Sequence, residues 1–67
     1  MIECAYLEGD PVLLGEIEAW TCINGEWRKM NHVDAFCKAR LLSAEQFESM
    51  FPKLPLLPVN AFTSESA

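Results

Sequence analysis

The sequence predicts an α+β domain with a three-stranded antiparallel β-sheet of meander topology, two short helices and a proline-rich C-terminal strap. Three observations support this fold class. The Asn24-Gly25 pair lies between two runs rich in β-branched and aromatic residues, which is typical of a β-hairpin. After Met30 the apolar residues recur at helical spacing. Near the C-terminus, a proline at every third position indicates extended chain.

Residues 2–7 form the first predicted strand, because their side chains alternate between two faces. Residues 8–11 follow as a turn, since Gly9 is free of φ restriction and Pro11 presets it. Residues 12–14 either lengthen the second strand backwards or cross over the sheet, and Gly15 is a candidate bulge. A lone hairpin is marginally stable in water, so we expect the first strand to complete the sheet.

The predicted hairpin covers residues 16–30. Asn24 and Gly25 both tolerate the positive φ of a type I′ turn, and this two-residue turn fixes the register. The expected pairs are Ile23–Glu26, Cys22–Trp27, Thr21–Arg28, Trp20–Lys29 and Ala19–Met30. We expect the core to lie on the face that has fewer carboxylates to desolvate. The apolar residues of that face are Ile17, Ala19, Ile23 and Met30.

The first helix is predicted to begin after Asn31, a good N-cap residue with Asp34 three positions later. We expect a length of about ten residues, typical of a globular domain. A helix this short must pack one side onto the sheet to be stable. The positions that recur at the required spacing are Val33, Phe36, Cys37, Arg40 and Leu41.

The second helix is predicted from a capping box formed by Ser43 and Gln46, and Pro52 ends it. Its apolar stripe consists of Phe47, Met50 and Phe51. Together the two helices are expected to meet near Leu42 and to cover the sheet.

Prolines 52, 55 and 58 predict a strap in the polyproline II conformation. The residues expected to lie over the core are Leu54, Leu56, Leu57 and Val59. A PxxP signalling ligand is the alternative interpretation, but no arginine flanks the prolines as such ligands commonly require. The chain is expected to form one small domain over residues 1–62, and residues 63–67, small and polar, are expected to be disordered.

Charge is distributed unevenly along the chain. Residues 1–26 contain six acidic side chains and no basic one, whereas residues 27–53 contain five basic and three acidic side chains. The first part carries −6 and the second +2, and Glu65 brings the total to −5. Direct binding of nucleic acid requires clustered Lys and Arg, so this pattern argues against it.

Cys4, Cys22 and Cys37 are odd in number and have no CxxC spacing, which argues against a disulfide framework. We expect them to be small buried residues in a reducing cytosol. A zinc site that combines them with His32 is the alternative, but it lacks close ligand pairs, and we expect no metal or cofactor. The sequence shows neither a signal peptide nor an apolar run of about 18 residues, so we expect a cytoplasmic protein.

The expected partner-binding residues are the acidic side chains of the first part and two tryptophans of the hairpin. Glu16 and Glu18 would project from one strand face about 7 Å apart, a spacing of the same order as that of phosphates along a nucleic-acid strand. The alternative is an ordinary solvated face, but such a face mixes charges of both signs. No Lys or Arg neighbours these carboxylates in the first 26 residues. The residues are Glu3, Glu8, Asp10, Glu16, Glu18, Glu26, Trp20 and Trp27.

Trp20 and Trp27 lie close across the predicted hairpin, so they are packing residues unless their face is exposed, in which case they are anchors for a partner. His32 is expected near the cap of the first helix. Catalysis by His32 would need a nucleophile and an orienting group, and no spacing assembles Ser43, Cys37 or Asp34 around it.

The chain resembles the small accessory proteins of bacteriophages and mobile elements. The residues that carry the resemblance are the Asn-Gly-Glu-Trp turn at 24–27 and the segment 41–55. Within that group its acidic balance is similar to that of anti-CRISPR proteins, several of which bind the surface of Cascade or a Cas nuclease that would hold target DNA. The resemblance implies a bacterial host cell and a CRISPR effector or another basic nucleic-acid-binding protein as partner.

The sequence therefore predicts a non-enzymatic acidic inhibitor that presents carboxylates where nucleic-acid phosphates would lie. The alternative is a small structural or assembly subunit, homodimeric through an exposed apolar sheet face, whose acidity serves solubility. An enzyme is the third class considered, and it would need a pocket that gathers His32 with Cys37 or Asp34.

Overall fold

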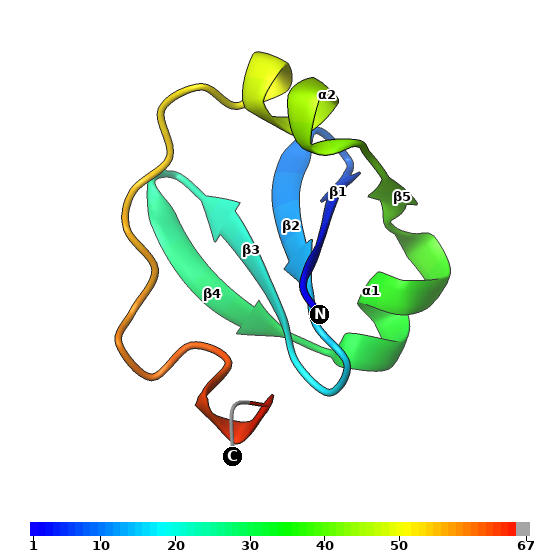
Figure 1. Ribbon diagram of the computed structural model, residues 1–67, viewed down its shortest axis with the longest axis vertical. Coiled ribbons are helices and arrows are strands. Elements are labelled where there is room, and N and C mark those ends of the chain that lie inside the picture. Colours follow the sequence, from blue (N-terminus) through cyan, green and yellow to red (C-terminus); the bar gives the residue numbers. More distant parts are fainter. Residues whose placement is uncertain (66–67) are drawn as a thin grey trace.

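The computed structural model describes residues 1–65, and Figure 1 shows an antiparallel sheet accompanied by two α-helices. The strands are β1 (Glu3–Leu7), β2 (Asp10–Leu14), β3 (Ala19–Ile23), β4 (Glu26–Met30) and β5 (Arg40–Leu41). The helices are α1 (His32–Lys38), α2 (Ala44–Met50) and the 3₁₀ turn η1 (Thr63–Glu65). The α+β class is confirmed.

The sheet has five strands in the order β4-β3-β2-β1-β5, all antiparallel, so the prediction of three strands was too coarse. The first four strands form a meander. Residues 12–14 neither lengthen the second strand nor cross the sheet: they belong to β2, between β1 and β3. The reason is a tight turn at Glu8 and Gly9, both with positive φ, which pairs Leu7 with Asp10. The chain therefore makes two hairpins of the same design.

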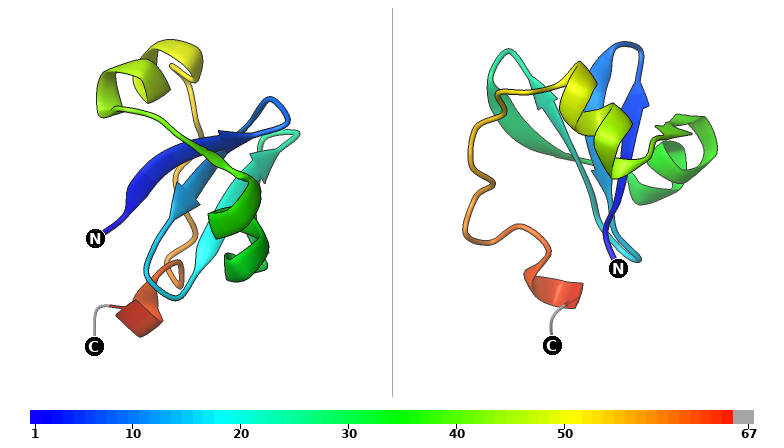
Figure 2. Two further views of the ribbon diagram at one scale, coloured as in Figure 1. Left: turned by 90° about the vertical axis from the view of Figure 1, so that its right-hand side faces the viewer. Right: turned by 45° about the horizontal axis from the view of Figure 1, so that its top comes forward.

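The predicted β3–β4 hairpin is confirmed in its turn and in all five pairs of its register. Asn24 and Gly25 have φ of 53° and 78°, as a type I′ turn requires. In Figure 2 the two hairpin turns lie side by side at one end of the sheet, and the β2–β3 loop lies at the other end.

The core lies between one sheet face and α1. Its fully buried members are small: Ala5, Val12, Ala19 and Ala35 are 0% exposed, with Leu14 beside them. The short alanine side chains let the helix backbone approach the sheet closely. Ala19 and Met30 lie on this face as predicted, but Ile17 and Ile23 remain exposed. Ile17 precedes β3 in the loop, and Ile23 ends the strand at its turn.

Helix α1 is shorter than predicted and turns a different side to the core. Asn31 caps it by accepting the Asp34 N–H, as expected, but the helix ends at Lys38 because Arg40 and Leu41 pair with β1. The predicted packing stripe is wrong: Val33 is 65% and Phe36 71% exposed, and Ala35 is the buried residue.

Helix α2 agrees with its prediction in position and cap. Ser43 and Gln46 form both hydrogen bonds of the capping box, at 3.1 and 3.0 Å. Phe47 and Phe51 pack against each other with ring centroids 5.4 Å apart. The helix buries none of its residues, so it lies at the margin of the sheet near β1 rather than over the core.

The chain after α2 runs along β4 without helix or strand to the far end of the sheet (Figure 1). The indole Nε1–H of Trp27 donates to the Pro55 carbonyl over 2.7 Å. Leu54 and Leu57 are half-buried as a strap would require, whereas Leu56 and Val59 are 95% and 100% exposed and do not cover the core.

Residues 63–65 were expected in a disordered tail, but they form η1, and the Glu65 carboxylate binds the β2–β3 loop. The preceding residue, Phe62, is buried against Trp20. The remainder of the predicted tail, residues 66–67, lies outside the described residues.

Candidate partner-binding surface

The six predicted carboxylates do not form one strand face, because they lie in three separate regions of the fold. Glu8, Asp10 and Glu26 belong to the two neighbouring hairpin turns (Figure 2). Glu3 and Glu16 lie at the opposite end of the sheet and line one pocket. Glu18 lies in the interior. The predicted pairing of Glu16 and Glu18 on one face is therefore not found, since both precede β3 in a loop.

At the turn end, Glu8 is exposed and Asp10 is half-buried. Glu26 is exposed and accepts a hydrogen bond from the Arg28 guanidinium at 3.3 Å, within the same strand. Arg28 thus neutralises part of this acidic group. An exposed ion pair of this kind contributes little to stability.

Glu18 is a buried carboxylate and cannot belong to a partner-binding surface. Its side chain is 5% exposed, and one oxygen lies 3.1 Å from the Lys29 Nζ on the neighbouring strand. The other oxygen is buried and has no hydrogen-bond partner in the described part of the chain. Sequence alternation placed Glu18 correctly on the face of Trp20, but it did not show that this face is covered.

Trp20 packs inside the protein, and Trp27 is partly covered by the C-terminal segment. Trp20 is 7% exposed and its ring lies 6.5 Å from that of Phe62, while Trp27 is half-buried and bonded to the strap. The structure therefore covers the sheet face on which they were expected as anchors, and they hold the C-terminal segment instead of presenting themselves to a partner.

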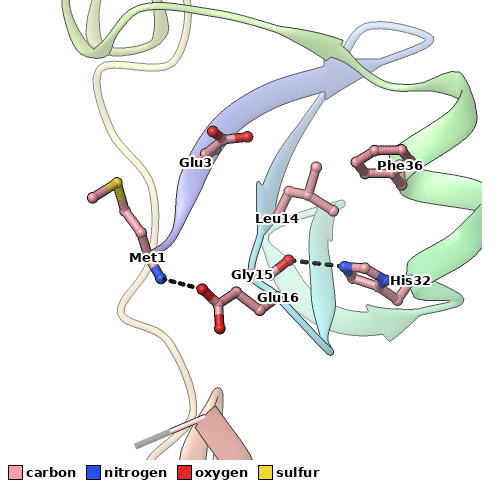
Figure 3. A pocket seen from close by; sticks show the side chains of 7 residues that line it. All are labelled: Met1, Glu3, Leu14, Gly15, Glu16, His32 and Phe36. Carbon is pink, nitrogen blue, oxygen red and sulfur yellow. Dashed lines mark hydrogen bonds and ion pairs between the residues drawn. The ribbon is translucent and has the colours of Figure 1, made fainter.

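Glu3 and Glu16 line a surface pocket of about 310 Å³ that we call the Glu3–Glu16 pocket. Figure 3 shows its seven lining residues, which come from the N-terminus, β1, the end of β2, the β2–β3 loop and α1. They are Met1, Glu3, Leu14, Gly15, Glu16, His32 and Phe36. The pocket combines carboxylates with exposed apolar side chains, and it brings together two of the predicted acidic residues from distant parts of the chain.

His32 closes the pocket at the start of α1. Its Nε2–H donates to the Gly15 carbonyl over 2.8 Å, because a carbonyl can only accept, and its ring stacks on that of Phe36 with centroids 6.4 Å apart. His32 is half-buried rather than a plain surface residue, and it fastens α1 to the β2–β3 loop. Neither Cys37, Ser43 nor Asp34 is among the residues that line this pocket.

The charges of the pocket are carboxylates and the chain's N-terminal amine. The Met1 amine lies 3.6 Å from Glu16 Oε1, and both groups are largely exposed, at 92% and 77% (Figure 3). Such a pair is mostly screened by solvent and is weak. Glu3 has no ion pair with a described residue, so the rim of the pocket remains acidic.

Beside the pocket, α1 exposes the apolar residues that the sequence assigned to the core. Val33 and Phe36 are 65% and 71% exposed, and Cys37 is exposed with them. A neighbouring apolar position, Leu41 on β5, is 57% exposed. Isolated exposed apolar side chains are common on protein surfaces, whereas a contiguous apolar patch is typical of an interaction site.

Glu65 is the residue that sequence analysis missed. Its carboxylate accepts hydrogen bonds from the backbone N–H groups of Glu16 at 2.8 Å, Ile17 at 3.3 Å and Glu18 at 3.0 Å. The bond from Glu16, followed by those from Ile17 and Glu18, lowers the pKa of the Glu65 carboxyl and outweighs its partial desolvation. A Cβ atom at Gly15 would overlap this carboxylate, so a side chain there would displace Glu65 from its hydrogen bonds.

The cysteines are all free among the described residues. Cys22 is buried, as predicted, whereas Cys4 is only half-buried, and burial raises the pKa of the Cys4 thiol. Cys37 was predicted to lie in the core and is exposed instead, because α1 buries Ala35.

Comparisons of the chain with protein-family models, with curated proteins and with solved structures found no match. Within residues 1–65, His, Cys, Asp and Glu side chains form no group of three that could hold a metal ion. No helix in the same range is long and apolar enough to cross a membrane. Inference of function for this chain therefore rests on its own surface.

Proposed function

We propose that this chain is a small non-enzymatic inhibitor that binds a basic nucleic-acid-binding protein in the cytoplasm of a bacterial host. The observation that carries the proposal is the Glu3–Glu16 pocket, which two carboxylates line together with an exposed aromatic side chain, Phe36 (Figure 3). Carboxylates at the rim would take the places of phosphates in the partner's groove and steer association. Phe36 would supply the apolar anchor that charge alone lacks.

The charge of the whole chain supports the same proposal. The net charge is −5, and the first basic residue in the sequence is Arg28. The β1–β2 hairpin and the β2–β3 loop are therefore free of Lys and Arg. The pocket itself presents the Glu3 and Glu16 carboxylates and the Met1 amine to a partner. A CRISPR effector complex is the first partner to test, since the chain resembles anti-CRISPR proteins in size and charge.

The proposal is tested by capture of a partner from lysate of the native host with the tagged protein, followed by washes at low and high salt and with added DNA. We expect a nucleic-acid-binding protein that is released both by salt and by DNA, because the interface is electrostatic and overlaps the nucleic-acid site. A captured partner that is indifferent to both would contradict the proposal.

A second candidate function is that of an assembly subunit, and the exposed apolar side of α1 favours it. A homodimer through an exposed sheet face has less support, because α1 covers one face and Phe62 packs against Trp20 on the other. Val33, Phe36 and Leu41 would form the contact instead. Sedimentation at two protein concentrations distinguishes the two functions. An assembly subunit requires a salt-insensitive dimer that the Phe36→Ser variant no longer forms. The inhibitor is instead a monomer, or it self-associates equally well with and without Phe36→Ser.

A further inference from the structure

The β2–β3 loop forms a small anion-binding site from its own backbone. Three successive N–H groups, those of residues 16–18, converge on a single carboxylate at 2.8 to 3.3 Å. The loop is held in this shape by a hydrogen bond from the Gly15 N–H to the Glu18 carbonyl over 2.8 Å. Converging backbone N–H groups of this kind bind carboxylates and phosphates in many proteins. In this chain the occupant is Glu65, from the far end of the sequence.

An aromatic contact accompanies the anion contact. Phe62 is 6% exposed and its ring packs at 6.5 Å from Trp20, two residues after the loop in the sequence. The Phe62 backbone has φ of 61°, a left-handed conformation that is unfavourable for an aromatic residue. Contacts around a residue must offset such a cost for it to persist. The tail is thus held by specific contacts at two points, three residues apart.

The segment that connects this tail to the sheet is loosely attached. Residues 51–59 contain no helix or strand, and Leu56 and Val59 are 95% and 100% exposed. From the sheet, Trp27 on β4 donates a hydrogen bond to the Pro55 carbonyl of this segment. Figure 1 shows the segment passing along the outside of β4 before it reaches the loop end. The C-terminal tail with Phe62 and Glu65 therefore binds the loop like a ligand, and residues 51–59 are the tether that connects it to the sheet.

We propose that the β2–β3 loop and Trp20 form a binding site for a segment with an aromatic residue followed three positions later by a carboxylate, and that the C-terminal tail of a second copy of this chain can fill it. The same Phe62 and Glu65 contacts serve in cis and in trans, so an exchange between two copies loses no interaction at either site. The exposed tether supplies the freedom for this exchange. The result is a symmetric, tail-exchanged dimer at high concentration.

The binding site is tested with a fluorescently labelled peptide of residues 58–65, amidated at its C-terminus, and with the full-length chain. Wild-type protein should bind it weakly, because the tethered tail competes at a high effective concentration. Full-length Glu65→Gln, whose own tail lacks the anion, should bind the peptide at least about tenfold more tightly. A peptide with Gln in place of its Glu should not bind. Equal binding of both peptides, or none to Glu65→Gln, would overturn the proposal.

The matched control is Glu48→Gln, the same chemical change at an exposed carboxylate of α2. It should bind the peptide like wild type and should keep any concentration-dependent dimer seen by sedimentation, whereas Glu65→Gln should lose that dimer. If Glu65→Gln fails to fold, Phe62→Ala provides the second variant, since it weakens the cis tail while leaving the loop N–H groups intact. Identical dimerisation of the Glu65 and Glu48 variants would contradict the exchange.

Discussion

Glu18 and Lys29 form an ion pair of 3.1 Å across the β3–β4 hairpin, in which the carboxylate is 5% exposed and the ammonium side chain 60% exposed. The two members of the pair differ in their surroundings. Solvent hydrates the Lys29 ammonium, whereas the buried charge of Glu18 is compensated by Lys29, since the second Glu18 oxygen has no partner among the described residues. A carboxylate that sequence analysis assigned to a partner is thus part of the fold.

Lys29→Met should destabilise the protein by about 2 kcal/mol. Breaking a fully buried pair costs roughly 3–5 kcal/mol, and water that reaches this exposed end of the pair reduces the cost. Urea unfolding measures the change, with Lys53→Met on the exposed strap as control. Equal stability of the two variants would show that Glu18 needs no counter-charge.

The hydrogen bonds to Glu65 predict a dependence of stability on pH. They hold the pKa of the folded carboxyl below its ordinary value of about 4.3, so the unfolded state binds the proton more tightly. The stabilisation is therefore complete above that ordinary value and is lost as pH falls through the lowered folded pKa. Thermal unfolding of wild type and Glu65→Gln across this range should give midpoints that converge as the pH falls. Parallel curves would contradict the assignment.

Ser43→Ala should cost about 1 kcal/mol of unfolding free energy, because the Ser43 hydroxyl accepts the Gln46 N–H at the start of α2. Ser49→Ala, an exposed serine in the same helix, is the matched control and should change stability little. Urea denaturation compares the two. A similar loss in both would mean that α2 is not held by its cap.

Gly9→Ala and Gly25→Ala should each destabilise by about 1 kcal/mol. Both glycines have positive φ, 88° and 78°, in equivalent hairpin turns, and nothing lies within 4 Å of a Cβ atom at either position. The cost is therefore conformational and not steric with a neighbour. Denaturant unfolding should give similar losses for the two variants. A loss in Gly25→Ala alone would mean that the first turn is not of the type I′ kind.

The elements that were predicted well depend on signals a few residues apart. The Asn24-Gly25 turn fixes its own register, and Ser43 with Gln46 caps α2 within one turn. The elements that were missed depend on distant partners. Arg40 and Leu41 become β5 only because the outer edge of β1 is free to pair, and this ends α1 early.

The candidate site could be predicted only in part, for the same reason. Glu3 and Glu16 were named from composition, but their meeting in one pocket with Phe36 follows from the placement of α1. Glu65 binds groups 47 to 49 residues earlier in the chain, and no local pattern signals such a contact. The sequence left open whether Trp20 packs in the fold or anchors a partner, and its ring contact with Phe62 shows that it packs in the fold.

The measurement that tests the proposed function most directly is the affinity of the captured partner for two charge-reversed proteins. Glu3→Lys with Glu16→Lys alters the Glu3–Glu16 pocket, whereas Glu45→Lys with Glu48→Lys makes the same change of net charge on α2. Glu18 is left unchanged because it is buried and paired with Lys29, so that its reversal would also affect stability. We predict a loss of binding of at least about tenfold for the first protein, which corresponds to about 1.4 kcal/mol, and little loss for the second. Equal affinities would remove the pocket from the mechanism.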